Sequence, residues 1–109
     1  MERRISQRGE MKFTVVQTRD GRDVRARATN VSATGIQLVC YDEPEFDPGA
    51  VVQLQLHLPG GGEPMNVKAS PVWKDGFREG LMFVDVADVD RLILAELLDR
   101  RRRSGRIYN

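Results

Sequence analysis

The stretch that decides the fold is FTVVQTRDGRDVRARATNVSATGIQLVC, residues 13–40. Near its middle lies Asp20-Gly21, a two-residue sequence that favours a tight turn between antiparallel strands. On both sides of this turn apolar and polar residues alternate, which is typical of strands with one buried face. A hairpin closed at Asp20-Gly21 pairs Phe13 with Ala28 and gathers most apolar side chains on one face. A slip of one residue would mix the two faces, so the pattern predicts this register.

The same stretch holds a second turn, Asn30-Val31-Ser32-Ala33-Thr34-Gly35. Asn and Ser hydrogen-bond to nearby backbone and favour turns, while Gly permits positive φ and close approach of another molecule. Extending the hairpin register places Asn30 opposite Met11, which lies three residues after Arg8. Three extended residues span about 10 Å. The N-terminal arginines Arg4 and Arg8 therefore come within reach of this turn.

Beyond the turn, alternating apolar residues predict further strands over residues 36–41, 52–58, 65–74 and 80–86. Pro71 interrupts one of these and indicates an edge strand or a bulge. Apolar residues at helical spacing run from Asp88, a suitable N-cap, to about Arg103. Five or six antiparallel strands followed by one helix predict a small closed barrel with a helical lid.

The length of 109 residues suits one domain. We expect a flexible arm over 1–10, a barrel over 11–86, a helix over 87–103 and a tail over 104–109. Basic residues concentrate at the ends, whereas residues 9–99 carry 9 basic against 15 acidic side chains. An acidic body argues against binding of DNA or RNA.

The sequence argues against a disulfide, a metal site, an enzyme active site and a membrane-spanning segment. Cys40 alternates with apolar residues of a predicted strand, so we expect it to be a core residue. Because it is the only cysteine, the chain cannot form an internal disulfide, which fits a reducing cytoplasm. His57 is the only histidine and falls on a polar strand face, so we expect no metal site. The sequence shows no cluster of His, Cys or carboxylate residues of the kind that catalysis needs, so we do not expect an enzyme. No apolar run approaches the roughly 20 residues that membrane insertion needs.

Two aromatic residues, Phe46 and Trp73, lie outside these alternating patterns or at the end of one. Phe46 lies in an acidic, proline-containing loop and is expected to pack beneath it. Trp73 is either a core residue, which we favour, or a stacking platform.

Two motifs together resemble the PilZ domain family. The first is Arg4-Ile5-Ser6-Gln7-Arg8, an Arg-xxx-Arg arm, and the second is the Asn-x-Ser-x-x-Gly turn from Asn30 to Gly35. The strand around Val72-Trp73, the later Gly80-Leu81-Met82-Phe83 and the terminal helix also fit, so the resemblance covers nearly the whole chain. It implies a six-stranded antiparallel β-barrel with a C-terminal α-helix that receives cyclic di-GMP, a bacterial second messenger.

The resemblance also implies roles for individual residues. Arg4 and Arg8 would grip guanine and phosphate, while Asn30, Ser32 and Gly35 would line the base-binding surface. Members with an additional arginine at the position of Arg3 tend to bind a stacked pair of ligand molecules. Arginine suits this ligand because its planar fork matches the guanine edge, stacks on purines and pairs with phosphate.

The expected mechanism is ordering of the arm around cyclic di-GMP, with the changed surface relayed to a downstream protein. No cofactor is expected besides this ligand. The alternative is a PilZ-like interaction module that does not bind the nucleotide.

Overall fold

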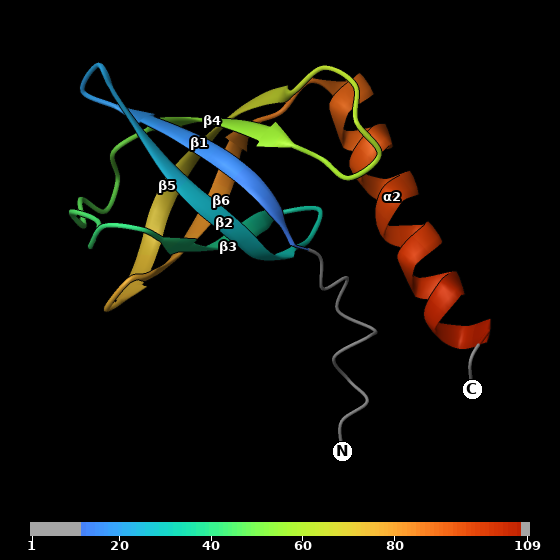
Figure 1. Ribbon diagram of the computed structural model, residues 1–109. Helices are drawn as coiled ribbons and strands as arrows, with labels where there is room; N and C mark the ends of the chain where they lie inside the picture. The colour runs from blue at the N-terminus through green and yellow to red at the C-terminus, as the bar shows by residue number, and fades with distance from the viewer. Residues whose placement is uncertain (1–11, 108–109) are drawn as a thin grey trace.

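The computed structural model describes the backbone of residues 12–107 and the side chains of residues 12–99. It contains six strands and one helix (Figure 1). They are β1 (Phe13–Arg19), β2 (Arg22–Val31), β3 (Gly35–Cys40), β4 (Val52–His57), β5 (Met65–Asp75), β6 (Arg78–Asp85) and α2 (Asp88–Ile107).

The strands form a closed antiparallel barrel in the order β1-β2-β3-β6-β5-β4. Pairing of β1 with β4 closes it, so that no strand edge within the barrel is left unpaired. This confirms the predicted six-stranded antiparallel barrel with a C-terminal helix.

The β1–β2 hairpin has the predicted register, with Phe13 opposite Ala28 and Val15 opposite Ala26. Asp20 and Gly21 both have positive φ, at 54° and 76°. Positive φ at both central residues is the geometry of the turn that matches the twist of the flanking strands.

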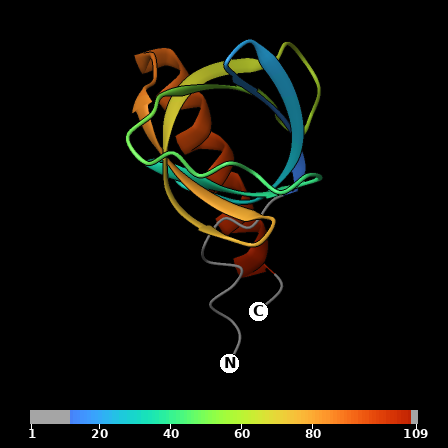
Figure 2. The same cartoon turned by 90° about the vertical axis from the view of Figure 1, so that its left-hand side faces the viewer.

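The barrel has two ends with different connections. At the turn end lie the β2–β3 turn (32–34), the β4–β5 connection (58–64) and the start of α2. At the loop end lie the β1–β2 turn, the β3–β4 loop (41–51) and the β5–β6 turn. Figure 1 shows α2 at the turn end, and Figure 2 looks into the loop end with the helix behind.

Inward side chains of all six strands build the core, and α2 adds one fully buried residue, Leu94. Leu97 and Leu98 pack against the same cluster. The helix therefore covers the turn end through one stripe of leucines, while Val89, Leu92 and Ile93 on its other side are exposed.

Three local features differ from the sequence-based expectations. The helix continues to Ile107, four residues past the expected 103. Phe46 is 41% exposed and does not pack beneath its loop. The β5–β6 turn is a tight Gly76-Phe77 connection, so Glu79 belongs to a strand and not to a loop.

Pro71 lies in a fully enclosed position on β5 next to a register shift between Pro71 and Trp73. The sequence left an edge strand and a bulge as alternatives, and the structure has the bulge. A closed barrel offers no free edge, so the strand accommodates the missing N–H of proline at an irregularity.

Candidate functional site

A bulge in β2 sets the direction of Asn30. Ala26 and Ala28 alternate into the core, and simple alternation would carry Asn30 inward as well. The register with β3 shifts between Ala28 and Asn30, because Ala28 pairs with Leu38 and Asn30 with the adjacent Gln37. The extra residue reverses the alternation, so Val31 is buried and Asn30 lies on the outer face.

Ser32 holds the β2–β3 turn together. Its backbone N–H donates to the Gly35 carbonyl at 2.9 Å. Its hydroxyl oxygen accepts from the backbone N–H groups of Thr34 and Gly35, both at 3.2 Å. The resemblance implies that Ser32 lines the base-binding surface, and this stays a prediction. The structure shows that the hydroxyl oxygen also holds the turn in shape.

Gly35 is required by a close approach of two strands. A Cβ at this position would lie 2.6 Å from the Leu81 carbonyl oxygen. Gly35 is absent from the glycines with positive φ, so the conformational freedom invoked from the sequence is not the reason for it. Thr34 adds a second tie between turn and β6, since its carbonyl accepts from the Phe83 N–H at 2.8 Å.

A lateral row of residues crosses four strands, from Asn30 near this turn to Trp73, which lies two residues before the end of β5. Asn30 on β2 pairs with Gln37 on β3, Gln37 pairs with Gly80 on β6, and Gly80 pairs with Trp73 on β5. Glu79 and Leu81, the neighbours of Gly80, are buried, so Gly80 faces outward. The row thus places an amide, a second amide and an indole on one outer surface.

Trp73 lies over Gly80 on the outside of the barrel. A Cβ on Gly80 would be 2.1 Å from the indole Nε1, so glycine provides the seat for the ring. Trp73 is partly exposed and does not belong to the core cluster. The favoured core assignment was wrong, because the bulge after Pro71 moves Trp73 out of the inward series.

The three arginines predicted for the site, Arg3, Arg4 and Arg8, lie outside the described residues, as does Met11. Of the six predicted site residues, the structure therefore brings together Asn30, Ser32 and Gly35. Their surroundings add Gln37 and Trp73, which the sequence did not assign to the site.

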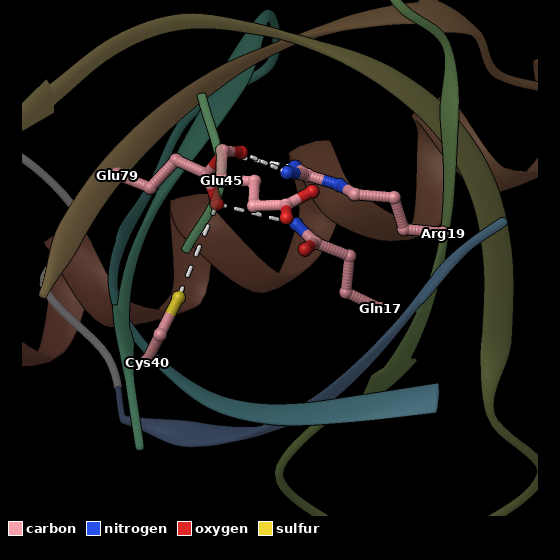
Figure 3. A network of polar contacts seen from close by, with 5 residues as sticks. All are labelled: Gln17, Arg19, Cys40, Glu45 and Glu79. Carbon is pink, nitrogen blue, oxygen red and sulfur yellow. Dashed lines mark hydrogen bonds and ion pairs between the residues drawn. The ribbon is translucent and has the colours of Figure 1, made fainter. Parts of the chain in front are cut away.

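The loop end contains a buried charge network that the sequence did not predict (Figure 3). Glu79 is fully buried, and its Oε2 accepts from Arg19 Nη2 at 3.0 Å. Its Oε1 accepts from Gln17 Nε2 at 3.3 Å. Arg19 Nη1 also donates to the backbone carbonyl of Glu45. The network ties β1, β6 and the β3–β4 loop together inside the barrel mouth.

Cys40 borders this network and is buried, as predicted. Its Sγ lies 3.9 Å from Glu79 Oε1, where the thiol can donate a weak hydrogen bond. Burial, followed by the nearby negative charge of Glu79, raises the pKa of the Cys40 thiol from 9.0 to about 11. A protonated, buried thiol is a poor nucleophile.

Within the part of the chain that the structure describes, no three His, Cys, Asp or Glu side chains gather as a metal site. Among the same residues, no helix is both long and apolar enough to cross a membrane.

Comparison with solved structures identifies the fold. The Bacillus subtilis inhibitor of motility, MotI/DgrA, superposes with a TM-score of 0.76 and 21% identity. The match covers 87% of this chain and 48% of that one, so this chain spans about half the length of that protein. An uncharacterized Legionella protein superposes with a TM-score of 0.50 and 16% identity, over 84% of this chain and 89% of that chain.

Curated protein sequences give no match to this chain. The sequence profile of the PilZ domain matches residues 2–100, which include both motifs and all six strands. The chain belongs to the PilZ domain family.

Proposed function

We propose that this PilZ domain is a cytoplasmic receptor for cyclic di-GMP, and neither an enzyme nor a nucleic-acid-binding protein. The observation that carries the proposal is the outer surface beside the β2–β3 turn. There the Ser32-closed turn adjoins Asn30, and the lateral row that begins at Asn30 reaches Trp73 three strands away. The arm motif Arg4-xxx-Arg8 precedes this surface in the sequence.

Each side chain has a chemical role toward a guanine nucleotide. The amide of Asn30 can both donate to and accept from a guanine edge. Arg4 and Arg8 supply bidentate contacts to guanine and charge-assisted contacts to phosphate. The Trp73 ring offers a stacking face, and base–aromatic stacking is worth about 1–3 kcal/mol per base.

The switch is an ordering of the arm. Ligand contacts offset the entropy cost of fixing residues 1–10, and the closed arm then presents a new surface to a downstream protein. One protein of this fold is an inhibitor of motility. Motility is therefore one process for the proposed receptor to regulate.

Calorimetric titration of cyclic di-GMP tests the proposal. Wild type should bind, and Arg4→Ala/Arg8→Ala should lose binding. The control variant Arg22→Ala/Arg25→Ala removes the same charge from exposed positions on β2 and should bind as wild type does. Equal binding by the arm variant would contradict the arm assignment. Absence of heat with wild type would favour the alternative, an interaction module that does not bind the nucleotide.

The stoichiometry of the same titration tests Arg3. A stacked pair gives two ligand molecules per chain for wild type. Arg3→Ala should then bind one.

A further inference from the structure

The loop end of the barrel carries a cavity of about 200 Å³ that the proposed nucleotide site does not use. One wall comes from the β1–β2 turn with Asp20 and Arg22, and the other from Asp42, Glu43 and Glu45 of the β3–β4 loop. The cavity opens at the end of the barrel that Figure 2 faces, opposite the β2–β3 turn.

The charge of this cavity is negative. Four carboxylates line it, against the guanidinium groups of Arg19 and Arg22. Arg19 is already paired with the buried Glu79, which neutralises it. Glu43 is held by Lys74 at 2.7 Å, and this contact lowers the pKa of the Glu43 carboxyl. Asp20, Asp42 and Glu45 remain as exposed carboxylates against the exposed guanidinium of Arg22, and this excess of negative charge favours a cation.

Three exposed aromatic side chains lie in the connections at the same end of the barrel as the cavity. Tyr41, next to Asp42, is 60% exposed, Phe46, next to Glu45, is 41% exposed, and Phe77 is 51% exposed. The Cys40 N–H donates to the Phe77 carbonyl at 2.8 Å, which keeps the loop beside the β5–β6 turn. Aromatic rings that stay exposed near carboxylates are typical of a contact surface, since they attract cations through their faces.

We propose that the loop end is a docking surface for a basic segment of a partner protein. An arginine or lysine side chain of that segment enters the cavity between Asp20, Asp42 and Glu45. Apolar or cationic neighbours pack on Tyr41 and Phe77. Nucleic acid and anionic membrane surfaces carry the same sign of charge as the cavity and are repelled.

The docking surface is independent of the proposed nucleotide site. The Asn30–Gly35 turn and the cavity lie at opposite ends of the barrel, so a nucleotide at the turn and a partner in the cavity can be bound together. A failure of cyclic di-GMP binding would leave this proposal standing, and the reverse also holds.

The test uses the full chain labelled with ¹⁵N and a synthetic peptide of alternating arginine and leucine. The proposal predicts that amide shifts change in residues 20–22, 41–47 and 76–78. Asp42→Asn/Glu45→Gln should weaken peptide binding about tenfold, as expected for loss of paired interface charges. The Glu45 carbonyl, which Arg19 contacts, is retained in this variant.

The matched control is Glu63→Gln/Asp85→Asn, which removes the same charge from exposed positions at the turn end. It should bind the peptide within about twofold of wild type, because distant exposed charges are screened. Equal weakening by both variants, or shifts centred on the turn end, would overturn the proposal. The basic run Arg100–Arg103 is a competing occupant. If the chain self-associates and Asp42→Asn/Glu45→Gln abolishes this self-association, the surface binds a second copy of the chain. That result would overturn the proposal of a separate partner protein.

Discussion

The two ends of this barrel are held together by different kinds of interaction. The turn end relies on small residues and backbone contacts, with the Ser32 hydroxyl closing the turn and Gly35 pressed against Leu81. The loop end relies on a buried charge, Glu79, and its partner Arg19. The first arrangement holds the β2–β3 turn against β6, and the second ties β1, β6 and the β3–β4 loop together at the barrel mouth. Changes at the loop end should therefore affect stability, and changes at the turn end should also affect binding.

The largest expected effect is that of Glu79→Ala. The variant leaves Gln17 without its acceptor and leaves the Arg19 charge unpaired, with only the Glu45 carbonyl as acceptor. Breaking a buried ion pair by removing one partner costs about 3–5 kcal/mol. Urea unfolding should show this loss in the free energy of unfolding, while the fraction that stays folded keeps its affinity for cyclic di-GMP.

The double variant Arg19→Met/Glu79→Leu controls for the missing partner. It removes both charges and fills similar volume, and such exchanges are often neutral or stabilising. Part of the stability should be recovered, because the unpaired charge is gone while the buried Gln17 amide still lacks its acceptor. A double variant as unstable as Glu79→Ala would show that shape, and not charge pairing, secures the loop end.

A smaller effect on stability, joined to an effect on binding, is expected for Gly35→Ala. The new methyl group would overlap the Leu81 carbonyl, and such overpacking costs about 2 kcal/mol. Because the turn must move away from β6, cyclic di-GMP affinity should fall as well. Urea unfolding and calorimetry measure the two effects.

Gly62→Ala is the matched comparison at the same end. Its φ of 88° makes alanine strained, but no atom lies within 4 Å of the added methyl group. It should lose some stability and keep its affinity for cyclic di-GMP. A loss of affinity in Gly62→Ala would mean that the ligand surface extends over the β4–β5 connection.

Local sequence patterns predicted what depends on near neighbours. Asp20-Gly21 and the alternation around it gave the hairpin register pair by pair, because the turn and the strand faces impose the same pairing. The same periodicities predicted five or six strands and the helix, and the structure has six strands. The Ser32 turn was located, although the use of its hydroxyl was not.

The remaining features depend on residues far away in the sequence. The bulge before Asn30 and the bulge after Pro71 have no local signature, yet they turn Asn30 and Trp73 outward. Glu79 looks like a loop residue until Arg19, sixty positions away, is folded against it. Pairing across the barrel, and not propensity, decides these positions.

Cys40 provides a pH-dependent test of the loop end. Its pKa is 9.0 ordinarily and about 11 in the folded state. Above pH 9 the unfolded thiol loses its proton while the folded thiol keeps it, so stability should decline between pH 9 and 11. The loss should reach about 1 kcal/mol by pH 10 relative to Cys40→Ala. Urea unfolding of both proteins at about pH 8 and pH 10 measures it.

If the free energy of unfolding changed with pH in the same way for wild type and Cys40→Ala, this would contradict burial of the thiol beside Glu79. Thiol labelling gives an independent reading. The folded protein should react slowly with an aromatic disulfide reagent, and denaturant should release the reaction.

The smallest effect is expected for Lys74→Ala. Lys74 and Glu43 form a close ion pair, but the Glu43 side chain is 61% exposed, and water and salt screen such pairs. The urea midpoint of Lys74→Ala should match that of Lys68→Ala, a change on the same strand, at both low and high salt. Peptide binding should strengthen instead, because Glu43 becomes available to a cation. A large loss of stability in Lys74→Ala that disappears at high salt would contradict this expectation. It would mean that the exposed Lys74–Glu43 pair, and not the buried Glu79–Arg19 pair, holds the β3–β4 loop. The difference between the two ends of the barrel would then depend on a surface ion pair.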